Sequence, residues 1–132
     1  MGGQQLLLIL LGVLLVGVAI AIGISLFADN AVMHSRDAIT NEMIRLAARA
    51  QQYYRTPQSM MGGGHSFSGL DDIKLLTSAS TGVVANYSLT NEGNSITLTG
   101  VGKDLGRDGI NPVTVVMVVL KDSMFLDLNK EN

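Results

Sequence analysis

The oxygen-bearing side chains of the segment Asp104 to Asn111 are the best candidates for chemistry in this chain. Asp104, Asp108 and Asn111 are spaced around a glycine turn in a way that partly resembles a calcium-binding loop. Gly106, however, stands where such a loop needs a further ligand, and Val115 stands where it needs a bidentate glutamate. We expect a simple Asx and glycine turn with no cofactor, and calcium at these three residues is the alternative.

A glycine-rich stretch from Gly62 to Gly69 contains His65 beside Ser66, with two aspartates shortly after it. It lacks the Lys-Ser/Thr ending of a phosphate-binding loop, and neighbours in the sequence do not have the geometry of a hydrolytic triad. The chain has no cysteine, which excludes thiol nucleophiles and cysteine-ligated metals. We therefore expect a connecting loop, anchored by Phe67, and no enzymatic activity.

Asn86 begins the triplet Asn-Tyr-Ser, which matches the sequon for N-linked glycosylation. The match is short, so it has little specificity. Asn86 is a candidate modification site only.

Charge is spread unevenly along the 132 residues, although the net charge is only −2. Residues 1–28 carry no charged side chain, residues 29–55 carry four bases and three acids, and residues 56–132 carry five bases and eight acids. A chain of this balance has no general attraction for phosphate backbones, so we expect no nucleic-acid partner. The chain divides into an apolar end, an amphipathic middle and a polar head.

The apolar end, within residues 1–28, contains an uninterrupted apolar run from Leu6 to Ala28, in which Ser25 is the only polar side chain. A helix of this length reaches roughly 35 Å, enough to cross a bilayer core of about 30 Å. A cleavable secretory signal is the alternative, but the run is long for one and no basic residue precedes it. The segment predicts a transmembrane helix.

Small residues recur within this run at spacings that let helix backbones approach closely. Ordinary transmembrane composition would also contain such residues, so both interpretations stay open. If copies of the helix pack together, we expect the contacts at Leu7, Leu11, Gly12, Leu14, Gly17, Ala21 and Gly23.

The middle segment, residues 29–56, continues without a helix breaker until Pro57. Its apolar residues recur every three or four positions, which predicts one apolar stripe on a helix. The residues of the stripe are Ile39, Met43, Leu46, Ala50 and Tyr53. The simplest interpretation is one continuous helix from about Leu6 to Arg55, whose second half packs against the head.

The head is expected to begin after a glycine- and serine-rich connection over residues 57–82. Within residues 83–132, alternating or β-branched runs at 83–90, 95–99 and 113–120 predict strands, with a short fourth near 124–128. These strands predict a small antiparallel sheet of three or four strands with one apolar face, which the stripe on the helix would cover. The expected class is α+β.

A long N-terminal helix, apolar and then amphipathic, followed by a small antiparallel sheet, resembles the type IV pilins and the pseudopilins of type II secretion. Members of that family are cut after a glycine, and a glutamate stands four residues after the new first residue. That position is Gln5 if Met1 is the first residue, or Leu8 if cleavage follows Gly3. The family's proline within the apolar segment is absent here.

The resemblance implies a structural subunit held in the bacterial inner membrane, handled by a pilus assembly machinery and polymerised into an extracellular filament on the cell surface. Side-by-side packing of identical apolar helices repeats by one screw operation and builds such a homo-oligomer. A minor or secretion pseudopilin is the first alternative. A single-pass membrane-anchored module whose head senses or binds a ligand is the second.

Overall fold

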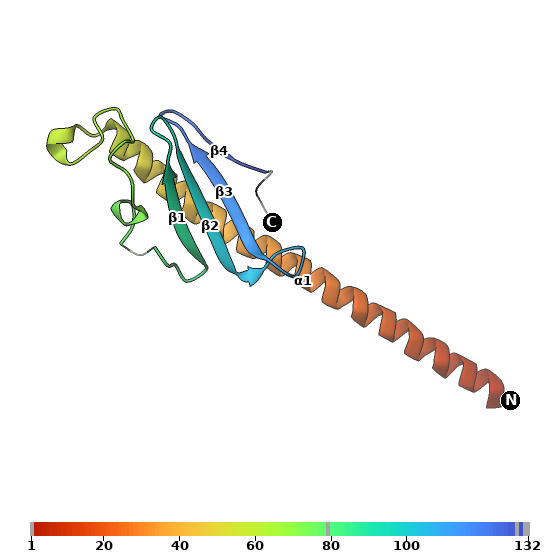
Figure 1. The fold of residues 1–132 in the computed structure, drawn as a ribbon. Helices are drawn as coiled ribbons and strands as arrows, with labels where there is room; N and C mark the ends of the chain where they lie inside the picture. Colours follow the sequence, from red (N-terminus) through yellow and green to blue (C-terminus); the bar gives the residue numbers. More distant parts are fainter. Residues whose placement is uncertain (1, 79, 129, 131–132) are drawn as a thin grey trace. The chain divides into compact units, whose positions relative to one another are not determined.

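The computed structural model describes residues 2–78, 80–128 and 130, and it confirms the expected α+β class. One long helix, α1 (Gly2–Arg55), is packed on an antiparallel sheet in the order β1-β2-β3-β4 (Figure 1). The chain divides into two compact units, one ending at Ala31 and the other beginning at Val32.

The first unit is the N-terminal part of α1, and its large apolar side chains are all exposed. Leu6 to Phe27 leave between about half and three quarters of their surface uncovered, as Val18 at 51% and Phe27 at 77% show. The run contains no proline, which would interrupt a helix. In a hydrocarbon environment the backbone must satisfy its own hydrogen bonds, and an aliphatic segment of this kind does so by forming a helix. One helix among the described residues is therefore long and apolar enough to cross a membrane.

The sheet of the second unit is a simple meander in which consecutive strands pair. Its strands are β1 (Ala85–Asn91), β2 (Ile96–Leu105), β3 (Pro112–Val119) and β4 (Met124–Leu126). Leu89 faces Leu98 across the first pair, and Leu98 faces Met117 across the second. The register of β2 on β3 shifts between Val101 and Leu105, where the hairpin approaches its tip.

The largest differences between the expected and the observed strand boundaries are at the start of β1 and at the end of β2. β1 begins at Ala85 because the Gly82 amide donates to the Ala85 carbonyl and turns the preceding residues aside. β2 continues to Leu105, beyond the expected end at Thr99, because glycines take over the inward-facing positions. The alternation of apolar side chains therefore ends before β2 does, and the predicted strand was too short.

The second half of α1 covers one face of this sheet, and the core lies between them (Figure 1). The helix contributes five fully buried residues: Ile39, Met43, Leu46, Ala47 and Ala50. Strands β2 and β3 contribute alternate residues, which are Ile96, Leu98, Val113, Val115, Met117 and Val119. The apolar side chains that recur every 3.6 residues on the helix and every two residues on the strands thus pack together in one apolar layer.

The connection between helix and sheet, residues 56–84, is mostly irregular and is anchored by a few apolar side chains. It contains the short 3-10 helices η1 (Gln58–Met60) and η2 (Ile73–Leu75). Phe67 and Leu70 are completely buried, and the Phe67 ring packs 4.8 Å from the Tyr54 ring. The predicted anchoring role of Phe67 is confirmed.

Candidate functional site

The predicted stripe on the amphipathic half of α1 packs on the head as expected. Ile39, Met43 and Ala50 are completely inaccessible and Leu46 is nearly so, whereas Tyr53 is half-buried at the end of the stripe. Ala47, which the spacing rule passed over, is also fully buried. Small residues at 47 and 50 let the last turns of the helix lie close to the sheet.

Two glycines of β2 set how closely the helix approaches the sheet. A Cβ atom built on Gly100 would lie 2.6 Å from Ile39 Cγ2 and 3.1 Å from Met43 Sδ. One built on Gly102 would lie 3.1 Å from Ile39 Cδ1. This contact was not predicted from the sequence, although a glycine inside a strand is a known sign of close backbone approach.

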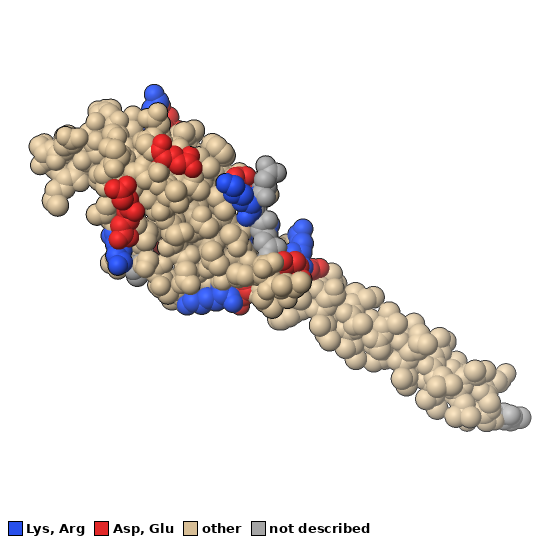
Figure 2. Space-filling view, in the orientation of Figure 1, with Lys and Arg blue, Asp and Glu red and all other residues tan. Residues whose placement is uncertain are grey.

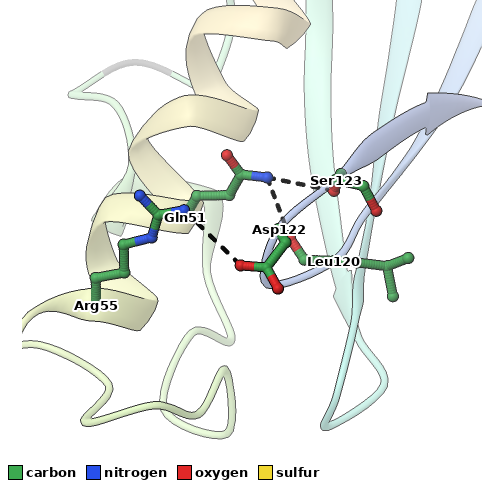
Figure 3. A network of polar contacts seen from close by, with 5 residues as sticks. All are labelled: Gln51, Arg55, Leu120, Asp122 and Ser123. Carbon is green, nitrogen blue, oxygen red and sulfur yellow. Dashed lines mark hydrogen bonds and ion pairs between the residues drawn. The ribbon is translucent and has the colours of Figure 1, made fainter.

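Polar side chains at the end of α1 tie the helix to the β3–β4 turn (Figure 3). The Gln51 side-chain amide donates to the carbonyls of Leu120 at 3.2 Å and Ser123 at 3.3 Å. The guanidinium of Arg55 lies 3.9 Å from the Asp122 carboxylate in an exposed ion pair. The Gln51 amide satisfies two backbone carbonyls of the turn, whereas the ion pair between Arg55 and Asp122 is exposed to solvent and therefore weak. Gln51 thus orients this turn more strongly than the ion pair does.

Two further side chains hold the connection against the unit. Arg49 donates to the Leu76 carbonyl at 2.6 Å, and the Asn91 amide donates to the Phe67 carbonyl. These bonds join segments 27 and 24 residues apart in the chain. The irregular connection is thus held by side-chain donors in place of a regular backbone ladder.

The seven residues predicted to pack between copies of the apolar helix all lie in the first unit and are all exposed. Figure 2 shows no blue or red side chain on the visible face of this segment. A Cβ atom added at Gly12, Gly17 or Gly23 would meet no atom within 4 Å. Nothing within the described part of the chain therefore requires glycine at these three positions.

The three candidate calcium ligands are occupied with separate local contacts. Asp104 accepts a hydrogen bond from the Ser35 hydroxyl at 2.7 Å. Asp108 Oδ1 accepts from the amides of Ile110 and Asn111, and its Oδ2 accepts from the Asn111 side-chain amide at 2.7 Å. This is the Asx turn that the sequence predicts, with Gly109 at a φ of 69°.

The acids and histidines of the described residues do not gather into a metal-binding group of three or more. The polar residues of the glycine-rich loop also have separate roles. Ser66 donates to the Ser68 hydroxyl, Asp72 accepts from the Lys74 amide, and the His65 ring packs edge-on against Tyr54. The structure does not bring His65, Ser66 and Asp72 together as a catalytic group.

Asn86, the candidate glycosylation site, is exposed in β1. Its neighbour Tyr87 points to the opposite face and is buried, as the alternation of a strand requires. Burial, and in second place the negative charge of Glu42, raises the pKa of the Tyr87 phenol above its ordinary value of 10.0. Tyr87 is therefore a neutral packing residue at physiological pH.

The edge of the sheet at β4 carries an apolar groove between this strand and α1. Its walls include the exposed side chains of Ile44, Phe125 and Leu128. The remaining lining residues are Thr40, Met117, Met124 and Leu126. This groove was not predicted from the sequence, because a strand of three residues, the length of β4, is too short to show a clear alternating pattern.

The described residues thus form two different parts: an uncharged helical segment whose apolar side chains are exposed, and a head with a tightly packed core. Comparison with protein-family models, with curated proteins and with solved structures finds no match to this chain.

Proposed function

We propose that this protein is the structural subunit of a type IV pilus-like extracellular filament, assembled by bundling of the apolar segment of α1. The observation that carries the proposal is the exposure of an uncharged helical segment on a chain whose other unit has its own core. The described residues leave this segment uncovered, so its cover must come from outside the chain.

The apolar run from Leu6 to Ala28 is too large to remain exposed to water. Burial of apolar surface contributes about 25 cal/mol per Å², so leaving even roughly 1,000 Å² in water would cost about 25 kcal/mol. That exceeds the whole stability of a typical domain, which is about 5–15 kcal/mol. The segment must therefore lie in lipid or against other copies of itself.

Three glycines support packing against other copies. In lipid, helices attract one another mainly through close packing, which small residues allow. Among the described residues no atom lies within 4 Å of a Cβ atom built on Gly12, Gly17 or Gly23, so a neighbouring helix has room to approach there. The absence of charge in this segment also spares the bundle an unpaired buried ion.

A subunit of this kind is stored in the bacterial inner membrane and passes to the cell surface through an assembly machinery, as the family resemblance implies. Its partners are copies of itself. The screw symmetry of identical side-by-side contacts gives an open filament in place of a closed ring.

The test is the substitution Gly17→Leu in the full-length protein, with Gly17→Ala as the matched control. Because a Cβ atom added at position 17 meets no atom of the described residues within 4 Å, we expect neither change to disturb the folded subunit. Leucine blocks close approach of a second helix, whereas alanine preserves it. We expect Gly17→Leu to abolish fibres in electron micrographs of sheared surface material and Gly17→Ala to keep them.

Membrane-fraction levels and the melting temperature of the head should be the same for both variants. Normal fibres from Gly17→Leu at normal protein levels would refute bundling through this face. A stable dimer in detergent, with no fibres from the unaltered protein, would favour the membrane-anchored sensing module.

A further inference from the structure

A cleft of about 470 Å³ lies at one end of the sheet, where the β1–β2 and β3–β4 turns meet the last turns of α1. Both turns lie at the same end of the sheet, because Ile96 pairs with Asn91 on one side and with Val119 on the other. We call this cleft the turn cleft, and its volume is within the range of about 300–1,000 Å³ that is usual for small-molecule sites. Its lining residues are Tyr54, Asn94, Leu120, Lys121, Asp122 and Ser123.

Hydrogen bonds and ring contacts fix the walls of the turn cleft. In the β3–β4 turn the Leu120 amide donates to the Ser123 carbonyl at 2.8 Å, and Gln51 donates to the carbonyls of both residues (Figure 3). On the side of α1, the Tyr54 ring packs against the Phe67 ring. The cleft is therefore preformed, so a ligand that binds there has little ordering of the protein to offset.

Four polar groups of the turn cleft make no hydrogen bond or ion pair within the described part of the chain. They are the hydroxyls of Tyr54 and Ser123, the side-chain amide of Asn94 and the ammonium of Lys121. A hydroxyl both donates and accepts, an amide does so through separate atoms, and an ammonium only donates. Uncommitted groups of this kind around one cleft suit a ligand that carries several polar groups of its own.

One positive charge is left over at the turn cleft. The Asp122 carboxylate is paired with the Arg55 guanidinium at 3.9 Å, whereas Lys121 has no acidic partner among the described residues. The other acid of the two turns, Glu92, does not line the cleft and accepts a hydrogen bond from the Ser95 hydroxyl. An ammonium without a partner favours a ligand with one negative charge, because a charge-assisted hydrogen bond is stronger than a neutral one.

The turn cleft also offers apolar surface, on the Tyr54 ring and on Leu120. A sugar ring presents C–H bonds on its faces and hydroxyls around its edge. It can therefore lie along apolar side chains while its hydroxyls form hydrogen bonds. A hexuronate adds one carboxylate to this pattern, so its chemistry matches the apolar surface, the uncommitted polar groups and the charge of the cleft.

We propose that the turn cleft binds an acidic saccharide, a sugar unit with one carboxylate such as a hexuronate. Lys121 pairs with the carboxylate, and Asn94 and Ser123 form hydrogen bonds with the ring hydroxyls. The lining residues all belong to the unit that begins at Val32, so the inference goes beyond the proposed filament and does not depend on it.

The test is isothermal titration calorimetry of D-galacturonate into the full-length protein in detergent, with D-galactose and inorganic phosphate as comparison ligands. Lys121→Gln removes the ammonium, and Asn94→Ala removes one of the groups assigned to the hydroxyls. Lys74→Gln is the matched control, because Lys74 is also exposed and its loss changes the net charge equally, but it does not line the turn cleft. Near-ultraviolet circular dichroism checks that each variant has a folded head.

We expect D-galactose, which lacks the carboxylate, to bind about tenfold more weakly than D-galacturonate. Lys121→Gln should weaken D-galacturonate binding by about tenfold and leave D-galactose binding unchanged, whereas Asn94→Ala should weaken both by about threefold or more. Lys74→Gln should have no effect. Tri-galacturonate identifies the source of the ligand: tighter binding than the single sugar supports an acidic polysaccharide, and equal binding supports a free acidic sugar.

Three results would overturn the proposal. The first is the absence of D-galacturonate binding to the unaltered protein. The second is an equal loss of binding in Lys121→Gln and Lys74→Gln, which would indicate a general effect of net charge. The third is phosphate that binds as tightly as D-galacturonate, with no effect of Asn94→Ala on the sugar, which would indicate a simple anion site. Fibre formation is scored separately in the Gly17→Leu experiment, so either proposal can fail alone.

Discussion

The glycine contact between β2 and α1 makes the sharpest prediction about the head. In Gly100→Ala the new methyl group would lie 2.6 Å from Ile39 Cγ2, whereas carbon atoms pack best at about 3.5–4.0 Å. The helix or the Ile39 side chain must therefore move by about 1 Å, and overpacking of this kind costs about 1–3 kcal/mol.

About 0.4–1 kcal/mol of that cost is offset in the unfolded state, because alanine has less conformational freedom to lose on folding than glycine has. The net loss in the free energy of unfolding should be about 1–2 kcal/mol. For a unit of this size it corresponds to a fall in Tm of roughly 4–15 °C. Gly102→Ala should cost less, since its nearest side-chain atom is the flexible end of Ile39 at 3.1 Å.

The assay is thermal unfolding of the full-length protein in detergent, followed by near-ultraviolet circular dichroism. All three tyrosines lie in the unit that begins at Val32, so the tyrosine band of the spectrum reports on that unit. The double variant Gly100→Ala/Ile39→Ala isolates the contact. In the Ile39→Ala background Gly100→Ala should lose most of its cost, a coupling of about 1 kcal/mol.

Two results would refute the reasoning about Gly100. The first is a Tm for Gly100→Ala at or above that of the unaltered protein. The second is an equal cost in both backgrounds, which would place the strain somewhere other than at Ile39.

Three further outcomes test the second unit. The pKa of Tyr87 is raised on folding, so its contribution to stability is complete below about pH 10 and is lost as the pH rises through the pKa of the folded state. Tyr87→Phe should therefore reduce the loss of the free energy of unfolding at alkaline pH, as measured by urea titrations. Gln51→Ala should lower the free energy of unfolding by about 1–2 kcal/mol, against less than about 0.5 kcal/mol for the exposed partner in Asp122→Asn. Calcium or a chelator should change Tm by less than about 1 °C, because Asp104 and Asp108 already accept hydrogen bonds from the protein.

Each of these has a contrary result. Identical alkaline curves for Tyr87→Phe and the unaltered protein would remove the tyrosine from the pH dependence. An equal cost for Gln51→Ala and Asp122→Asn would contradict the ranking of the two contacts, and a calcium-dependent rise in Tm that Asp108→Asn abolishes would restore the calcium hypothesis.

Local pattern alone was enough to predict the class of the fold. The uncharged run from Leu6 to Ala28, the absence of a breaker before Pro57, and the spacing of Ile39, Met43 and Leu46 each depend on residues close together in the chain. Helix and strand periodicity are local properties, so they can be identified without knowing what the elements pack against. For the same reason, the Asx turn at Asp108 was predicted correctly.

Contacts between distant segments could not be predicted in this way. Gly100 is explained only by Ile39, which lies on a different element far back in the sequence, and Asp104 proved to be a partner of Ser35, which is 69 residues away. The role of Gln51 likewise became visible only when the structure placed the β3–β4 turn beside it. A sequence pattern shows which face of an element is apolar, but the distance and register at which two faces meet depend on packing, and packing exists only once the chain has folded.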